Sequence, residues 1–182
     1  MDGPFSDPAK NIEHFGLTEG MVVADFGAGS GAYTLAVAKK ISQSGKVYAV
    51  DVQQALLTRL AAVAREAHLS NVEIVWGDIE KVGGSKLADR KVELVIIANV
   101  LFQSSARYSI LLEAKRVLMP GGRVALVEWQ DSFGGLGPKP EQVLGPAEAE
   151  QICLQAGFAK LLDFPAGAHH YGQLWRVADK TV

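Results

Sequence analysis

Short apolar runs alternate with one-sided apolar repeats along most of the chain. Five runs of strand length occupy residues 21–26, 46–50, 72–76, 92–98 and 123–129. Over 32–42, 53–68 and 104–118, apolar residues recur at intervals of three and four, the spacing of amphipathic helices. The fourth run is so apolar at 94–97 that both of its faces must be covered. This alternation predicts a parallel sheet with right-handed crossovers and helices on both faces.

The two ends of the chain add further elements to this pattern. Asp7 and Pro8, followed by residues 9–15 and Gly16, predict a short helix with Asp7 as its N-cap. Residues 130–145, rich in glycine and proline, predict a surface connection, and 146–156 predict a helix that Gly157 ends. Runs at 158–164 and 170–177 predict a closing antiparallel hairpin about a turn at 165–167.

A glycine-rich turn follows the first strand directly. Gly27, Gly29 and Gly31 stand at alternate positions, and a helical pattern starts immediately after them. Glycine lets the backbone approach a ligand closely, and the N-terminus of the following helix offers unpaired N–H groups and a positive dipole end. The turn therefore predicts a site for a polar ligand. Because it also fits the G-x-G-x-x-[G/A] pattern of dinucleotide enzymes, the glycines alone do not identify that ligand.

Polar side chains mark the ends of four predicted strands. Asp25 precedes the glycine turn, Asp51 ends the second strand, Asp78 follows the third and Asn99 follows the fourth. Ligands of such sheets bind at the carboxyl ends of the strands, so we expect these side chains to converge on one edge. With either kind of nucleotide cofactor, Asp51 is the expected partner of the ribose hydroxyls.

Composition narrows the class of protein. With 182 residues, 48% of them hydrophobic and 21% charged, the chain suits one globular domain with a sizeable core. A net charge of −2 and a pI near 6.1 argue against a nucleic-acid partner. We expect neither a membrane span nor a signal peptide. The single cysteine, Cys153, fits a reducing cytoplasm, and its apolar helical setting predicts a buried thiol.

Five motifs in order resemble those of class I S-adenosylmethionine-dependent methyltransferases. They are residues 23–31, 50–51 (Val-Asp), 76–79 (Trp-Gly-Asp-Ile), 92–95 (Val-Glu-Leu-Val) and 118–122 (Leu-Met-Pro-Gly-Gly). The resemblance is strongest to the UbiE-like and small methyltransferase-domain groups. It implies an α/β, Rossmann-like three-layer sandwich whose seven-stranded, mostly parallel sheet has the order 3-2-1-4-5-7-6 and ends in an antiparallel hairpin. It also implies one domain over residues 1–182, with a helical segment at 1–16 over the site, a cofactor-binding half at 21–129 and an acceptor side at 130–182.

The resemblance implies S-adenosylmethionine as cofactor, with S-adenosylhomocysteine as product, and it gives roles to matching residues. Gly27, Gly29 and Gly31, with Ala28 between them, would pass beneath the methionine part of the cofactor. Asp25 would order this loop and meet the amino group directly or through water.

The remaining matching residues lie at the ends of the next three strands. Asp51 would accept both ribose hydroxyls, and Asp78 would receive the adenine amino group. The others would flank the adenine or line the methionine end: Val52, Gln53, Gly77, Ile79, Asn99 and Val100.

The expected reaction is methyl transfer by in-line displacement to a small-molecule acceptor. Orientation supplies much of the rate, and a general base is needed only where the acceptor carries a proton. The catalytic residue is not identified by the motifs; the candidates are Glu128, His14, His169, His170 and Asp131. Because His169 and His170 are adjacent on an expected strand, their side chains would point to opposite faces, and we expect no metal site.

The short connections leave the expected acceptor site open. Residues 2–15, residues 130–145 or another subunit would complete it, and the chain would be a monomer or a homodimer. Phe102, Trp129 and Tyr171 are candidates for an apolar acceptor pocket. Two alternatives stay open: a nicotinamide-dependent oxidoreductase, which the lack of a second domain disfavours, and a non-catalytic scaffold subunit that keeps the cofactor pocket.

Overall fold

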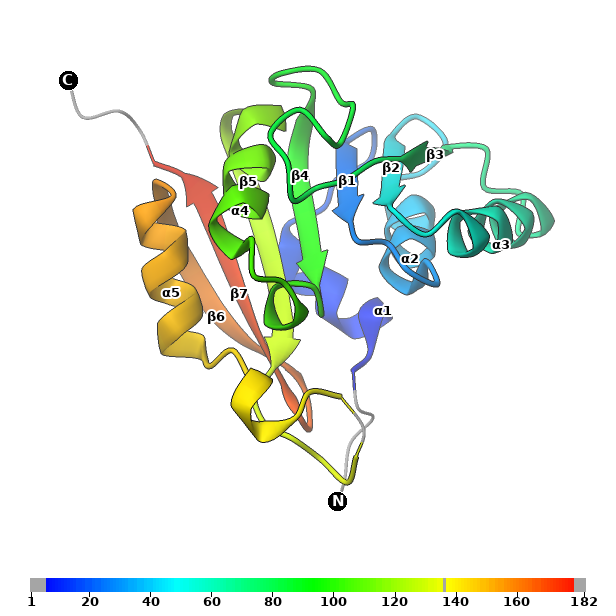
Figure 1. The fold of residues 1–182 in the computed structure, drawn as a ribbon. Helices are drawn as coiled ribbons and strands as arrows, with labels where there is room; N and C mark the ends of the chain where they lie inside the picture. Colours follow the sequence, from blue (N-terminus) through cyan, green and yellow to red (C-terminus); the bar gives the residue numbers. More distant parts are fainter. Residues whose placement is uncertain (1–5, 136, 179–182) are drawn as a thin grey trace.

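A seven-stranded sheet forms the centre of the molecule (Figure 1). The structure is a computed structural model that describes residues 6–135 and 137–178. The sheet order, β3-β2-β1-β4-β5-β7-β6, confirms the expected one, with β1 to β5 parallel and β7 antiparallel to both of its neighbours. The strands are β1 (Val22–Phe26), β2 (Lys46–Asp51), β3 (Val72–Trp76), β4 (Val92–Ala98), β5 (Leu118–Trp129), β6 (Phe158–Gly167) and β7 (His170–Val177).

Helices cover both faces of the sheet and complete the expected three layers (Figure 1). On one face lie α1 (Pro8–Asn11), which continues as the 3-10 helix η1 (Ile12–Phe15), then α2 (Ala32–Lys40) and α3 (Gln54–Glu66). On the other lie α4 (Arg107–Val117) and α5 (Pro146–Gln155). Two further 3-10 helices, η2 (Leu101–Gln103) and η3 (Pro140–Gln142), lie in the connections after β4 and β5.

Successive residues of the central strands alternate between two cores. Val23 and Leu94 pack in the core with Val37 of α2, whereas Val95 packs in the other core with Ile110 of α4. All five side chains are fully buried. Since β4 is covered on both faces, its sequence has no polar side, as the apolar run predicted.

Two strand boundaries differ from the sequence prediction. The strand β5 begins at Leu118 and not at residue 123, and residues 120–122 form an irregularity inside it, with φ of 74° at Gly121. The strand β6 continues to Gly167, which places the hairpin turn at 168–169 and not at 165–167. Both segments contain proline and glycine, which a bulge or an edge strand tolerates as well as a turn does.

The helix α4 begins at Arg107, three residues later than the repeat over 104–118 predicted. Ala106 occupies the N-cap position and makes no side-chain capping bond. Ser104 donates its hydroxyl to Glu80 Oε1 at 2.6 Å and accepts the Ala106 N–H at 2.9 Å. This serine therefore ties two connections together one turn before the helix begins.

Glu113 of α4 is fully buried and holds the connection between β3 and β4. Its carboxylate accepts the N–H groups of Gly83 at 2.6 Å and Ser85 at 3.1 Å, and Arg116 Nε donates to it at 2.8 Å. Burial by itself would raise the pKa of Glu113, but the bonds from Arg116, Ser85 and Gly83 outweigh burial and lower that pKa to about 2.

We expect Glu113→Gln to lower the free energy of unfolding at pH 7 by about 3 kcal/mol, because it breaks a buried ion pair. The ordinary pKa of 4.5 lies above the folded value of about 2, so the ionised carboxylate stabilises the fold above pH 4.5 and this contribution is lost as pH falls from 4.5 to 2. Urea unfolding across this range should show the difference from wild type shrinking. The control, Glu73→Gln, removes an exposed pair with Lys46 and should cost less than about 1 kcal/mol; a similar loss in both variants would contradict the prediction.

Candidate functional site

A cleft of about 800 Å³ opens at the carboxyl ends of the parallel strands. It is bordered by the glycine turn after β1, by the ends of β2, β3 and β4, and by Ser6 and Pro8 of the N-terminal segment. The structure brings together nearly all the residues that the sequence assigned to a cofactor. Those that line the cleft are Asp25, Gly27, Ala28, Gly29, Asp51, Val52, Gln53, Gly77, Asp78, Ile79, Asn99 and Val100.

The glycine turn is fixed against β2 and against the connection that follows β4. Gly27 N and Ala28 N both donate to Val50 O, at 2.8 and 3.1 Å. Gly27 has φ of 73°, and a Cβ at this position would lie 2.5 Å from Val100 Cγ2. A side chain at Gly27 would therefore displace the neighbouring wall of the cleft, so glycine is needed here for both conformation and close approach.

Gly31 is the one expected cofactor residue that does not line the cleft. It occupies the N-cap of α2 with φ of 85°, and a Cβ there would lie 2.1 Å from Leu60 Cδ1 on α3. The third glycine thus serves the close packing of α2 against α3. The sequence pattern cannot separate this packing role from ligand contact, because both need the same residue.

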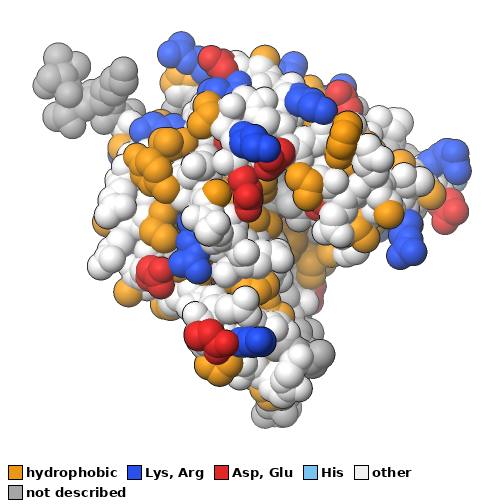
Figure 2. Space-filling view, in the orientation of Figure 1, with side chains coloured by type: hydrophobic (Ala, Val, Ile, Leu, Met, Phe, Trp, Pro, Cys, Tyr) orange, Lys and Arg blue, Asp and Glu red, His pale blue; other side chains and the backbone are white. Residues whose placement is uncertain are grey.

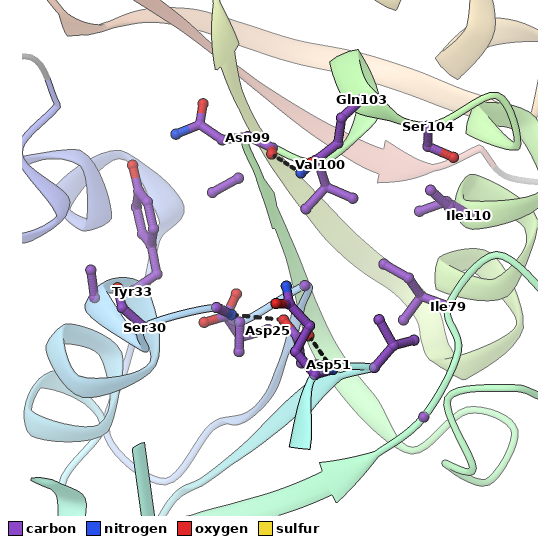
Figure 3. A pocket seen from close by; sticks show the side chains of 18 of the residues that line it. Asp25, Ser30, Tyr33, Asp51, Ile79, Asn99, Val100, Gln103, Ser104 and Ile110 are labelled. Atoms are coloured by element: carbon purple, nitrogen blue, oxygen red, sulfur yellow. Dashed lines mark hydrogen bonds between the residues drawn. The ribbon is translucent and has the colours of Figure 1, made fainter. Parts of the chain in front are cut away.

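Asp51 joins the two loops at the centre of the cleft. Its Oδ2 accepts Gly29 N at 2.9 Å and its Oδ1 accepts Gln53 N at 2.8 Å, and the residue is 7% exposed. Each carboxylate oxygen can accept a second hydrogen bond, so both remain able to receive the hydroxyls of a ligand (Figure 3). The site therefore suits a diol, while ribose binding itself stays a prediction.

Asp25 lies below the glycine turn and is 2% exposed. Burial raises the pKa of Asp25 to about 6, although hydrogen bonds from Thr34 oppose the shift. Thr34 Oγ1, on the buried side of α2, donates to Asp25 Oδ2 at 2.6 Å. Thr34 belongs to none of the sequence motifs; the signal that points to it is a hydroxyl on the buried face of the helix that follows the glycine turn.

Residues 78–81 form the side of the cleft where the sequence predicts the adenine, and polar contacts fix this segment. Lys81 forms an ion pair with Asp78 Oδ2 at 2.8 Å, and its hydrogen bond lowers the pKa of Asp78. Glu80 also lines the cleft and receives the bond from Ser104. These contacts fix the end of β3 beside η2.

Further polar groups line the opposite end of the cleft (Figure 3). The hydroxyl of Tyr33 accepts Asn11 Nδ2 at 2.8 Å, and burial raises the pKa of Tyr33, which keeps it protonated. Asn99 has φ of 57°, and its buried Oδ1 has no hydrogen-bond partner among the described residues. Gln103 Nε2 donates to Asn99 O at 2.9 Å. Tyr33 and Gln103 were missed in the sequence because no motif includes them.

All charged side chains among the described lining residues are carboxylates. They are Asp25, Asp51, Asp78 and Glu80. Clefts lined by one sign of charge attract ligands of the other sign, so this cleft favours cationic and neutral molecules over anions. Elsewhere on the face shown in Figure 2, Lys and Arg side chains are interspersed with Asp and Glu, without a continuous basic patch.

Glu128, the candidate base on β5, does not line the cleft. It is fully buried, and its Oε1 accepts the N–H groups of Val100 at 2.9 Å and Leu101 at 2.7 Å. Burial raises the pKa of Glu128 to about 7, although these backbone bonds oppose the shift. The carboxyl group therefore acts on the loop after β4 and does not face an acceptor.

The histidine candidates also lie outside the cleft lining. His14 is exposed and stacks on Phe164, with ring centroids 4.8 Å apart. His169 Nδ1 lies 2.8 Å from Asp131 Oδ1, and the ring of His170 lies 4.2 Å from that of Trp129. The expectation that both histidines share one strand was wrong, because His169 is in the hairpin turn and only His170 belongs to β7.

The aromatic residues proposed for an acceptor pocket are likewise absent from the described lining: Phe102, Trp129 and Tyr171. The Tyr171 hydroxyl instead donates to Leu144 O at 2.8 Å. Within residues 6–135 and 137–178, no group of three or more His, Cys, Asp or Glu side chains could hold a metal ion. No helix in the same ranges is both long and apolar enough to cross a membrane.

Comparison with known proteins gives consistent matches. Residues 17–155 match a family described as a methyltransferase domain. A solved S-adenosylmethionine-dependent methyltransferase from Aquifex aeolicus is 30% identical, with a TM-score of 0.86 over 96% of this chain and 91% of that one.

Two curated relatives match over shorter ranges. A demethylmenaquinone methyltransferase of Lactococcus lactis is 28% identical over 66% of this chain and 46% of its own length. An arsenite methyltransferase of Aquipseudomonas alcaligenes is 32% identical over 59% of this chain and 32% of its own length. The matches thus span less than half the length of these two relatives.

We expect Asp51→Ala to weaken binding of S-adenosylhomocysteine by more than about tenfold, because it removes the acceptor of two backbone N–H groups and, as predicted, of the ligand's ribose hydroxyls. Calorimetric titration checks this, with circular dichroism to establish that the variant is folded. Glu19→Ala, at an exposed turn position, is the matched control and should bind like wild type. An unchanged affinity in Asp51→Ala would remove the ribose assignment.

Proposed function

The chain belongs to the class I S-adenosylmethionine-dependent methyltransferases, in the UbiE-like group, and we propose that it transfers a methyl group from S-adenosylmethionine to a small, uncharged organic molecule. The observation that carries the proposal is the cleft at the strand ends, where the residues assigned to the cofactor at the ends of β1, β2, β3 and β4 meet, with the exception of Gly31. This family membership argues against the nicotinamide-dependent alternative.

The residues of the cleft suit this cofactor. When bound, S-adenosylmethionine supplies a methyl group on a positively charged sulfur, and the carboxylates of the cleft favour a cation. We assign the ribose hydroxyls to Asp51 and the adenine amino group to Asp78. Asn99 Oδ1, buried without a partner among the described residues, offers an acceptor for an N–H group at the methionine end.

We place the acceptor at the end of the cleft where Tyr33 lies, beside Ser6, whose hydroxyl is 3.3 Å from that of Tyr33. The apolar lining of the cleft includes Pro8, Ala98 and Val100. Sites of this kind bind compact molecules through apolar contact and orient them with a few polar groups. Since the candidate bases do not line the cleft, we propose that the protein accelerates transfer chiefly by orienting the acceptor and excluding water.

The names of the relatives suggest two kinds of acceptor, a quinone precursor and arsenite. Arsenic(III) is a soft centre that prefers thiolate ligands. The single cysteine of this chain, Cys153, is buried on α5 as predicted, and burial raises its pKa to about 12. An organic acceptor therefore fits this chain better than arsenite does.

The proposal also covers the role of the N-terminal segment, the partners, the location and the oligomeric state of the protein. Ser6 and Pro8 line the cleft, which supports a covering role for residues 1–16, of which 1–5 lie outside the described ranges. The four lining carboxylates disfavour nucleic-acid phosphates. The buried free thiol of Cys153 fits a cytoplasmic protein, and we propose a monomer or a homodimer.

We expect label from methyl-labelled S-adenosylmethionine to enter the small-molecule fraction of a cell extract incubated with the protein. Chromatography separates this fraction from RNA and protein, and the Asp51→Ala variant measures the background because its cofactor binding is impaired. Label confined to RNA or protein would contradict the proposed acceptor class. Cofactor binding without any labelling would support the scaffold alternative.

A further inference from the structure

We propose that Glu128 is a positioning residue that holds residues 99–103, here called the wall loop, in the arrangement that binds the methionine part of the cofactor. The inference rests on the proposed function, since it assigns the wall loop to cofactor binding. Asn99, Val100 and Gln103 of this loop line the cleft, whereas Glu128 does not (Figure 3). The carboxylate would therefore act on the ligand only through the backbone.

Glu128 accepts two backbone N–H groups of the wall loop. Its Oε1 accepts both Val100 N, at 2.9 Å, and Leu101 N, at 2.7 Å. These N–H groups stand at the start of η2, which has no side-chain cap of its own. The first N–H groups of a helix lack partners within it, so a buried carboxylate at this position replaces the missing cap.

Arg107 holds the same loop from its carbonyl side. Its Nε donates to Leu101 O at 2.9 Å, its Nη2 donates to Phe102 O at 3.5 Å, and its Nη1 pairs with Glu148 Oε1 on α5 at 2.7 Å. Two N–H groups of the wall loop thus bind β5 through Glu128, and two of its carbonyl oxygens bind α4 through Arg107. The loop is anchored on two sides to rigid elements.

The wall loop needs such anchors because of its own conformation. Asn99 is in the left-handed region, with φ of 57°, which a non-glycine residue adopts at a cost. Asn99 N donates to Val127 O at 2.8 Å, one residue before Glu128. Val100 lies so close to Gly27 that a Cβ on the glycine would clash with it. A small shift of the wall loop would therefore move the wall of the cleft and disturb the glycine turn.

Two ligands and two substitutions separate positioning from packing. S-adenosylhomocysteine carries the amino-acid part that the wall loop would contact, and 5′-methylthioadenosine lacks it. Glu128→Leu fills a similar volume without an acceptor, whereas Glu128→Gln keeps an amide oxygen for Val100 N and Leu101 N. We expect Glu128→Leu to weaken S-adenosylhomocysteine about tenfold or more, because buried donors lose their acceptor.

The same calorimetric titrations give the remaining expected values. The affinity for 5′-methylthioadenosine should differ from wild type by less than about threefold in Glu128→Leu. In Glu128→Gln, the affinities for both ligands should differ from wild type by less than about threefold. Glu113→Gln is the matched control, because it replaces a second buried carboxylate that accepts two backbone N–H groups, in the connection between β3 and β4. It should lower stability and leave the ratio of the two affinities unchanged.

The possible outcomes are distinct. Wild-type affinity in Glu128→Leu with weaker binding in Glu128→Gln would identify a packing role and overturn the inference, as would an equal loss for both ligands. If Glu128→Leu does not fold, Arg107→Met provides a second test, because Arg107 is partly exposed. This variant should also lose affinity for S-adenosylhomocysteine but not for 5′-methylthioadenosine, by a smaller factor. An equal change in both affinities would overturn the inference. A wild-type protein that binds neither ligand would overturn the proposed function itself.

Discussion

The carboxylate of Asp51 is shared by the N–H groups of Gly29 and Gln53, and the geometry of the cleft depends on this shared acceptor. Strands in a parallel sheet end at the same edge, where the loops leave and their N–H groups lose ladder partners. The protein meets this need three times with a buried carboxylate that accepts two backbone donors: Asp51 after β2, Glu113 for the connection after β3, and Glu128 for the loop after β4.

The buried carboxyl groups differ in how their charge is compensated. Glu113 has the guanidinium of Arg116 in direct contact, and its pKa is lowered to about 2 despite burial. Asp25 and Glu128 receive only hydroxyl and backbone donors, and burial raises their pKa values to about 6 and about 7. The charge of the carboxylate is thus fully compensated at Glu113, which has a structural role. Asp25 and Glu128, beside the cleft, have no cationic partner in direct contact among the described residues, and a cationic ligand in the cleft would favour the ionised form of Asp25.

Much of the architecture was predictable because it follows from periodicity. Alternating apolar runs and amphipathic repeats gave the parallel strands, and the resemblance to a known family gave their order; polar residues at strand ends located the cleft. Roles that depend on which neighbouring segment a residue faces were not predictable. Gly31 faces Leu60 on α3, Glu128 faces a backbone loop, and His169 lies in a turn because β6 continues past Pro165. In each case the residue type is compatible with two environments, and only packing between distant segments selects one.

The end of the cleft beside Tyr33, where we place the acceptor, shows why the motifs do not specify the molecule that is methylated. Tyr33 is held by Asn11, whose amide also donates to Ala166 O at 3.0 Å near the end of β6. One wall of this end is therefore assembled from three segments far apart in the chain, and all three residues lie outside the cofactor motifs. Because the Asn11 Nδ2 group can only donate, the Tyr33 hydroxyl must accept from it and can donate its own proton either to Ser6 Oγ, 3.3 Å away, or to a ligand. If the acceptor binds beside Tyr33, as proposed, its selection depends on contacts between the N-terminal segment, α2 and the hairpin.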